Sequence, residues 1–332
     1  MGLSNSSNRL RTALRGGRTY EKRKILVLGC MGSGKTTLCR MLAKSANAQL
    51  CPARFYKHTI ENNLLEICKE IYRIACAHNI IGSQQFEGDM TILMNFRHKE
   101  DLHKNAVEAM KRIIKSNLYS EIVKDKKRIL DLPYNAPYFM ANYERILDSR
   151  FYPTDADLTI IYSQTVGVNF QSIDVGVVRY ELYELPGHHI FRRYWTEFYP
   201  NTNVIIFVID LSDLCRAAMY DGGHLQDKVR KILLAVTMSK LLHNTSFILL
   251  FNKRDLLEEI GGGFSFSGLG AGVKSWESSE KYYMEQCQSA VPPTNEVYQH
   301  VMSLTKKPDM NTTLFESLEK IFQSGVRSLD LE

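Results

Sequence analysis

Two kinds of hydrophobic spacing divide the chain. From about Phe55 to Asn79, apolar residues recur at steps of three and four, which predicts one long amphipathic helix. Further segments with helical spacing are Lys104–Ile114, Glu121–Leu130 and Tyr138–Leu147. Because this part of the chain has little strand character, we expect residues 48–155 to be all-helical.

Short apolar runs on either side of that block predict buried strands. The first, Lys24–Leu28, leads straight into a glycine-rich turn and an expected helix over Gly34–Ala43. The others are Phe170–Asp174, Val178–Tyr183, Val204–Asp210 and Phe247–Phe251. Since helical stretches separate the later runs, we expect an α/β fold whose mainly parallel sheet is covered by helices on both faces.

Two segments near the C-terminus have distinctive patterns. The glycine-rich segment Gly261–Gly272 has the composition of a flexible surface insertion. A later apolar stripe with helical spacing predicts core packing rather than chemistry. The stripe consists of Leu314, Phe315, Leu318, Ile321 and Phe322.

Length and charge narrow the possible functions. The 332 residues fit two compact domains, or one domain with a large insertion. The net charge of +6 resides in the first 24 residues, which hold seven basic side chains and one acidic side chain. The remainder is formally neutral and shows no basic surface interleaved with aromatics, so nucleic-acid binding is not expected. No apolar run is long enough to span a bilayer, and the polar, basic N-terminus does not resemble a secretory signal.

The turn after the first strand carries the strongest chemical signal. Residues 29–36 read Gly-Cys-Met-Gly-Ser-Gly-Lys-Thr and fit the pattern G-x-x-x-x-G-K-[ST] between a strand and a helix. Glycines let consecutive backbone N–H groups face phosphate, and the helix N-terminus adds partial positive charge. In such a loop Lys35 reaches the β- and γ-phosphates, and the Thr36 hydroxyl ligates magnesium. The expected ligand is therefore a nucleotide with Mg²⁺.

A second element distinguishes guanine from adenine. Asn252-Lys253-Arg254-Asp255 follows the apolar run Phe247–Phe251 and resembles the N-K-x-D element of GTPases. The resemblance implies that Asp255 accepts hydrogen bonds from N1 and the exocyclic amine of guanine, a donor pair that adenine lacks. A P-loop kinase or ATPase is therefore not expected, and GTP and GDP are the expected cofactors.

Further motifs place the resemblance more closely. Thr165-Val-Gly resembles the first switch of GTPases, and Glu184-Leu-Pro-Gly-His stands where the second switch carries D-x-x-G-Q. Met302-Ser-Leu-Thr replaces the T-C-A-T loop that backs the guanine ring. Thr165 follows Thr36 by 129 positions, far more than a Ras-like GTPase uses there. A helical domain inserted at this place is the hallmark of heterotrimeric G-protein α subunits, and the chain is identified as a divergent member over residues 24–326.

This resemblance implies an organisation and a set of contacts. It implies a Ras-like P-loop GTPase domain formed by residues 24–47 and 156–332, an inserted helical domain at 48–155 and an N-terminal arm at 1–23. Nucleotide contacts are implied for Gly29, Met31, Gly32, Ser33, Gly34, Lys35, Thr36, Thr37, Thr165, Gly187, Asn252, Lys253, Asp255, Leu304 and Thr305. The implied magnesium ligands are Thr36 and Thr165, with Glu184 in the outer coordination sphere.

Positions that speed hydrolysis in this family differ here. The resemblance puts His188 where a glutamine orients the attacking water, and Tyr162 where an arginine stabilises the transition state. Met31 replaces the glycine that leaves room for the glutamine, and Gly32 replaces the acidic partner of the arginine. Because such an arginine contributes about 10³–10⁵ in rate and tyrosine carries no positive charge, slow hydrolysis is expected. The alternative is that another arginine serves, with Arg179 and Arg192 as candidates.

The N-terminal arm predicts a location. Residues 1–6 fit M-G-x-x-x-[ST] for N-myristoylation at Gly2. A single acyl chain anchors weakly, but the basic arm would add attraction to anionic lipid. The expected location is the cytoplasmic face of the plasma membrane, with a soluble cytoplasmic pool.

The resemblance also implies partners and a function. The partners are βγ subunits, a receptor or other exchange factor, an effector and a GTPase-activating protein, although the arm that docks βγ is shorter than usual. We therefore expect a membrane-associated GTP/GDP switch that transduces a receptor signal and hydrolyses GTP slowly. The alternative is a scaffold that holds nucleotide constitutively and does not cycle.

Overall fold

Two units make up the chain. The computed structural model describes residues 21–45, 52–96, 102–165, 167–175, 178–221, 224–306, 314 and 316–320. One unit, the sheet unit, contains Met1–Leu50, Gln164–Glu259 and Phe266–Glu332. The other, the helical unit, contains Cys51–Ser163 and the short segment Ile260–Ser265. The second boundary thus lies at Ser163 rather than at residue 155, because helix α8 (Asp155–Ile160) belongs to the helical unit.

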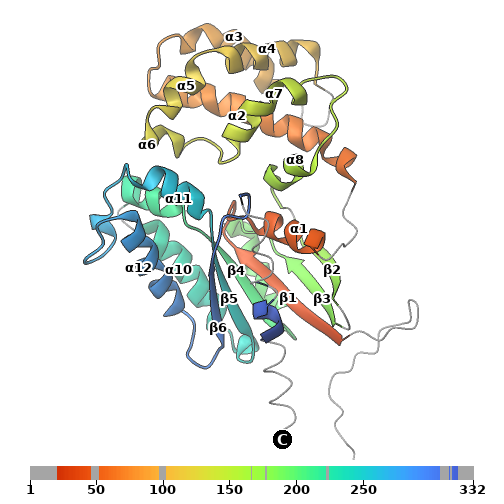
Figure 1. The fold of residues 1–332 in the computed structure, drawn as a ribbon, viewed down its shortest axis with the longest axis vertical. Helices are drawn as coiled ribbons and strands as arrows, with labels where there is room; N and C mark the ends of the chain where they lie inside the picture. The colour runs from red at the N-terminus through yellow and green to blue at the C-terminus, as the bar shows by residue number, and fades with distance from the viewer. Residues whose placement is uncertain are drawn as a thin grey trace, which may run out of the picture. The chain divides into compact units, whose positions relative to one another are not determined.

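Within the described residues, six strands form the sheet unit's centre, in the order β2-β3-β1-β4-β5-β6 (Figure 1). Their bounds are β1 (Glu21–Gly29), β2 (Asn169–Val175), β3 (Val178–Glu184), β4 (Val204–Asp210), β5 (Ser246–Asn252) and β6 (Val297–Val301). The β2–β3 pair is antiparallel, and all other neighbouring pairs are parallel. The expected mainly parallel sheet is confirmed. The strand order brings the carboxyl ends of β1, β4 and β5 to one edge.

Helices cover both faces of this sheet. On one face, α1 (Lys35–Ser45) buries Leu38 and Leu42 in a core with Ile25 of β1 and with Leu318 near the C-terminus. On the opposite face lies α12 (Trp276–Gln288), whose Tyr283 ring is 6.4 Å from the ring of Phe251. The unit's other helical segments are η3 (His189–Phe198), α9 (Asp213–Arg216), the π-helical η4 (Ala217–Asp221), α10 (His224–Thr237), η5 (Lys240–Leu242), α11 (Arg254–Gly261) and η6 (Ser267–Leu269).

The helical unit is organised around one long helix, α2 (Lys57–Ala77). Its apolar stripe, including the buried Ile60, Leu64 and Ile71, contacts helices α3, α4, α5 and α7. Within the described residues the unit contains only helices and connecting turns, as its hydrophobic spacing predicts. The other bounds are η1 (Ala53–Tyr56), η2 (Ser83–Phe86), α3 (Glu87–Met94), α4 (Lys104–Lys115), α5 (Leu118–Val123), α6 (Lys126–Ile129) and α7 (Ala136–Ile146).

An ion pair between the half-exposed Arg145 and the buried Asp157 joins α7 to α8. The Arg145 guanidinium donates to both oxygens of Asp157 at 2.7 and 3.0 Å, and the Tyr138 hydroxyl donates at 2.7 Å. Thr154 caps α8, and its backbone N–H donates to the Asp157 carboxylate at 2.7 Å. Burial opposes ionisation, but Arg145 and the Thr154 amide hold the pKa of Asp157 below its usual value. These contacts therefore hold α7 and α8 together.

Three details differ from the sequence-based expectations. The helix expected over Glu121–Leu130 is broken into α5 and α6, because Asp125 is extended and its side chain caps α6 at the Lys127 N–H. Strand β6 was not expected, since polar residues interrupt its apolar pattern and all five residues are only half-buried. The segment expected to be a flexible insertion carries the fully buried Phe266, so part of it is packed.

Candidate nucleotide-binding site

Glycines shape the loop between β1 and α1. Gly29 and Gly34 have φ angles of +143° and +107°, which residues with side chains rarely adopt. A Cβ on Gly29 would lie 2.3 Å from the Val208 carbonyl oxygen, and one on Gly34 would lie 2.3 Å from Asn252 Nδ2. The loop is therefore pressed against the ends of β4 and β5, where only glycine fits.

Lys35 folds back over this loop. Its Nζ donates to the carbonyl oxygens of Gly29 at 3.1 Å and of Cys30 at 2.7 Å. Burial lowers the pKa of Lys35 to about 8, and the Glu184 carboxylate opposes that shift. Beside it, the buried Ser33 hydroxyl has no hydrogen-bond partner among the described residues. A desolvated ammonium and an unsatisfied hydroxyl in one loop fit a polar, anionic ligand.

Asn252 links the loop Gly29–Lys35, called the phosphate loop here, to the segment Asn252–Asp255, called the base-reading element after the GTPase motif it resembles. Its Nδ2 donates to the Ser33 carbonyl at 2.8 Å, and its Oδ1 accepts from the Leu304 backbone N–H at 3.1 Å. The Asp255 N–H donates to the Ser303 hydroxyl at 3.0 Å, which fixes the backbone at the start of α11. The loop, the end of β5 and the segment after β6 therefore form one hydrogen-bonded assembly, as parallel strand ends allow. Leu304 is buried there, whereas Thr305 is exposed.

Side chains behind the base-reading element form a charged cluster. Lys253, at φ +63°, places its Nζ 2.5 Å from the Asp210 carboxylate, which also accepts from the Ser212 hydroxyl at 2.6 Å. Burial raises the pKa of Asp213 to about 6, and the nearby Asp210 carboxylate adds to the shift. Sequence reasoning missed this cluster. Its signal was available, because Asp210 ends β4 in register with Asn252 at the end of β5.

Three oxygens meet at the other end of the loop. The Thr36 and Thr165 hydroxyl oxygens are 3.2 Å apart, and Thr165 donates to Glu184 Oε1 at 3.1 Å. The Thr36 hydroxyl donates to the same Glu184 oxygen. Asn169, which faces Glu184 across the β2–β3 pair, donates to the second oxygen, Oε2, at 3.0 Å. The structure therefore brings the three predicted metal-site residues together, and Asn169 is a further member that the sequence did not reveal.

The second-switch segment lies against the phosphate loop. A Cβ on Gly187 would lie 2.5 Å from the Gly29 carbonyl oxygen and 2.6 Å from Lys35 Nζ. The Arg192 guanidinium holds the segment by donating to the Gly187 carbonyl at 3.0 Å. His188 uses its Nδ1 to accept from the Ile190 N–H at 3.4 Å at the start of η3. The His188 ring thus acts as a helix cap in this conformation.

Tyr162 and Met31 stand at positions where the family carries catalytic groups, and Arg179 is a candidate replacement; the structure locates all three. Tyr162 belongs to the helical unit, where its backbone N–H donates to Asn63 Oδ1 and its carbonyl accepts from Asn63 Nδ2, both at 2.7 Å. The Tyr162 side chain is half-exposed, as is that of Met31 in the phosphate loop. Arg179 is paired with Asp174 at 2.6 Å on the β2–β3 hairpin. Neither Tyr162 nor Met31 can supply positive charge.

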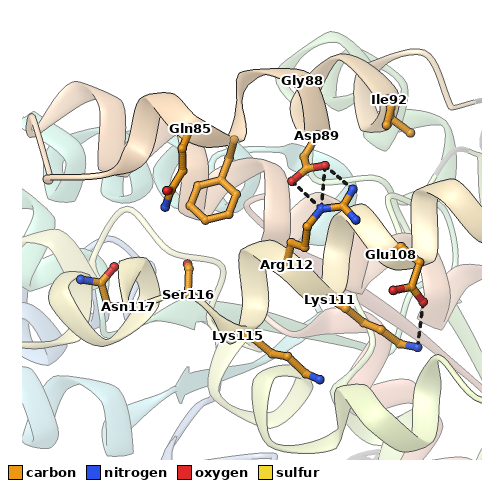
Figure 2. A pocket seen from close by; sticks show the side chains of 11 residues that line it. Gln85, Gly88, Asp89, Ile92, Glu108, Lys111, Arg112, Lys115, Ser116 and Asn117 are labelled. Atoms are coloured by element: carbon orange, nitrogen blue, oxygen red, sulfur yellow. Dashed lines mark hydrogen bonds and ion pairs between the residues drawn. The ribbon is translucent and has the colours of Figure 1, made fainter.

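The helical unit contains an open groove of its own. Figure 2 shows side chains of α3 and α4 lining it, with Ser116 and Asn117 at one end. Arg112 Nε lies 3.1 Å from both Asp89 oxygens, and Lys111 lies 3.2 Å from Glu108. These carboxylates pair with Arg112 and Lys111, and the third basic side chain of the lining, Lys115, is exposed, so the groove offers no buried cation with which to hold a phosphate.

The fold and the site together define a Ras-like P-loop GTPase domain with an inserted helical domain. A family model described as "G-protein alpha subunit" matches residues 4–322. The chain therefore belongs to the G-protein alpha subunit family, whose members are guanine-nucleotide-binding signal transducers. Within the described residues, no helix is long and apolar enough to cross a membrane.

The relatives indicate a divergent member. The alpha-2 subunit of a guanine nucleotide-binding protein from Neurospora crassa is 23% identical, over 93% of this chain and 90% of that protein. The alpha-2 subunit from Caenorhabditis briggsae is 25% identical, over 71% of this chain and 69% of that protein. The alpha-1 subunit from Oryza sativa subsp. japonica is 26% identical, over 71% of this chain and 67% of that protein.

Proposed function

We propose that this chain is a magnesium-dependent switch that binds GDP and GTP between the phosphate loop and the base-reading element. The proposal rests on the two hydrogen bonds of the Asn252 side chain, one to Ser33 of the phosphate loop and one to Leu304 in the segment after β6. These bonds fix the distance between the expected phosphate and base contacts. In this proposal Lys35 and Gly187 bind the terminal phosphates, and Asp255 accepts from the guanine edge. Met31, Gly32, Thr37, Lys253 and Thr305 complete the proposed contacts.

The three side chains whose oxygens meet beside the phosphate loop fit a magnesium ion. Thr36, Thr165 and Glu184 offer hydroxyl and carboxylate oxygens, which are the donors that Mg²⁺ prefers. Bound there, the ion would neutralise phosphate charge and link Thr165 of the first switch to the nucleotide. This supports a conformation of the first switch that depends on the γ-phosphate.

Binding can be tested with fluorescent nucleotides. Purified protein stripped of nucleotide with EDTA should take up labelled GDP and GTP in a Mg²⁺-dependent manner, and unlabelled ATP should not displace them. ATP competing as well as GTP would refute the guanine assignment.

Hydrolysis is proposed to be slow. The support is the loss of the glutamine, arginine and glycine positions to His188, Tyr162 and Met31, and the use of the His188 ring as a helix cap. The triple variant Met31→Gly, Tyr162→Arg, His188→Gln should hydrolyse GTP faster than the single variants predict together, because such groups act as a unit. Arg192, which already touches Gly187, is the candidate for a replacement cation. Single-turnover hydrolysis by Arg192→Gln, which removes the charge, tests that alternative: a rate well below that of the unmodified protein would assign the role to Arg192.

The same substitutions support a second candidate function. A chain that keeps its binding groups but lacks hydrolytic groups could hold nucleotide constitutively and act as a scaffold. Nucleotide exchange measured beside single-turnover hydrolysis separates the two. Exchange and hydrolysis both slower than the protein's turnover in cells would favour the scaffold.

Membrane association and partners complete the proposal. Gly2 lies outside the described residues, and its myristoylation together with the basic arm is proposed to hold the chain at the cytoplasmic face of the plasma membrane. The proposed partners are a receptor or other exchange factor, an effector, a GTPase-activating protein and βγ subunits. Gly2→Ala and raised salt should each release the protein from vesicles of anionic lipid.

A further inference from the structure

The Glu184 carboxylate stands unusually close to both threonine hydroxyls. Its Oε1 accepts from Thr36 and, at 3.1 Å, from Thr165, and those two hydroxyl oxygens are themselves 3.2 Å apart. Magnesium holds its six oxygens in an octahedron at about 2.0–2.1 Å, so neighbouring ligands lie about 3 Å from each other. The Thr165 hydroxyl oxygen therefore lies at the spacing of an adjacent ligand from both other oxygens, and Thr36 is in direct contact with Glu184 Oε1, with no water between them.

The backbone and a neighbour aim this oxygen. Glu184 ends β3 in register with Val27 of β1 and Asn169 of β2, so strands on both sides hold its main chain. Asn169 occupies Oε2 at 3.0 Å, which turns Oε1 towards the hydroxyls. An aspartate on the same backbone would be shorter by one C–C bond of about 1.5 Å and would stop short of this position.

The charge balance also calls for a cation. Glu184 is 1% exposed and forms no ion pair within the described residues. Lys35 is near enough for the two charges to interact, but its Nζ donates to the carbonyls of the phosphate loop. A buried carboxylate without an ion-pair partner is costly, and a divalent ion against Oε1 would remove that cost.

We propose that Glu184 binds the magnesium ion directly, replacing a water molecule that a shorter aspartate would leave on the metal. This inference rests on the proposed nucleotide function and changes the role of Glu184 from an outer-sphere residue to a ligand. A direct carboxylate adds negative charge to the coordination shell, and ligand charge raises the affinity of such sites. The ion is then held tightly in the GDP state as well, before Thr165 contributes.

The experiment counts water on the metal. Full-length protein is loaded with GDP and Mn²⁺, which serves as a paramagnetic probe for the magnesium site, and its EPR linewidth is compared in ordinary and ¹⁷O-enriched water. The unmodified protein should carry one water fewer than Glu184→Asp. Glu181→Asp shortens a glutamate of the same strand that pairs with Lys22, and should give the unmodified count. Equal water counts for the unmodified protein and Glu184→Asp would overturn direct ligation.

A titration supplies a second readout. In the GDP state, Mg²⁺ affinity should fall at least about 10-fold in Glu184→Asp, because even outer-sphere substitutions cost that much, and further in the uncharged Glu184→Gln. An unchanged affinity in both variants would also overturn the inference. Different results would refute the proposed nucleotide binding and the assignment of Glu184 as a metal ligand. A protein that binds no guanine nucleotide refutes both, whereas one that binds GDP and Mn²⁺ with equal water counts refutes only the ligand assignment.

Discussion

The ion pair between Lys253 and Asp210 offers a direct test of how the base-reading element is supported. The two side chains are 12% and 8% exposed, and the Lys253 ammonium lies 2.5 Å from Asp210 Oδ2. Asp210→Asn keeps the shape of the side chain, and its amide oxygen can still accept from the Ser212 hydroxyl. The group that faces the Lys253 ammonium is then either an amide N–H or a neutral oxygen, and no longer a carboxylate. The variant therefore removes the charge and little else.

The expected cost follows from the burial of the pair. Removing one partner of a buried ion pair costs about 3–5 kcal/mol, and the slight exposure of Lys253 places this case near 3 kcal/mol. At 2–4 °C per kcal/mol for a domain of this size, the melting temperature should fall by about 6–12 °C. Because Lys253 belongs to the base-reading element, part of the cost should appear as faster GDP release, up to about 100-fold.

Asp213→Asn is the matched control, with the opposite expectation. The pKa of Asp213 is raised to about 6 by burial and by Asp210, so the folded protein holds this proton more tightly than the unfolded chain. Stability from this group is present at low pH and is lost as pH rises from about 4 to 6, by about 3 kcal/mol at most. At pH 7.5, Asp213→Asn should therefore be neutral or stabilising, although it loses the 3.1 Å contact with Arg216.

Thermal unfolding and GDP release of both variants, measured at pH 7.5 and pH 5, decide the matter. If Asp210→Asn and Asp213→Asn lowered the melting temperature equally at pH 7.5, the electrostatic reasoning would be wrong. Unchanged GDP release in Asp210→Asn would show that Lys253 does not depend on the ion pair for its position.

Three further outcomes are expected. Asp255→Asn should lose GTP affinity and gain relative affinity for xanthine nucleotides, measured by competition binding. Thr36→Ala should weaken Mg²⁺-dependent binding of both GDP and GTP, whereas Thr165→Ala should blunt only the GTP-induced change in tryptophan fluorescence; identical behaviour would remove the switch assignment. Asp157→Asn should lose about 1–3 kcal/mol at neutral pH, the usual cost of weakened hydrogen bonds to a buried group whose ion-pair partner is partly solvated, and the depressed pKa of Asp157 makes its contribution present above pH 4 and lost in acid. Chemical unfolding that shows no difference between the variant and the unmodified protein at pH 7 would contradict it.

Local patterns were the most reliable guides to the fold. The strand, turn and helix around Gly29–Lys35 could be predicted because each part is specified by its own residues, and β4 matches its apolar run, Val204–Asp210, from end to end. Strand β6 could not be predicted in this way. Its residues are only half-buried and it is defined by pairing with β5, which is a contact distant in sequence.

The residues of the site also divide into those that the sequence identifies and those that only the fold reveals. The phosphate loop and Asn252–Asp255 are contiguous motifs, so sequence alone identifies them. Asn169 and Asp210 act only through the fold, because strand register brings them to Glu184 and Lys253, which are 15 and 43 positions away in the chain. No local pattern of residues indicates such long-range contacts.

The hydrogen bonds of Asn252 separate two properties that the N-K-x-D element combines in four residues. The Asn252 amide points inward and fastens the strand ends, and a Cβ on Gly34 would collide with it. The Asp255 carboxylate faces the exposed Lys306 ammonium at 3.4 Å. In the proposed function, base recognition by Asp255 and the fastening of the strand ends by Asn252 thus reside in different side chains. A substitution at Asp255 would then change which base is bound while the Asn252 hydrogen bonds stay in place, which makes this chain a starting point for a switch that responds to a different nucleotide.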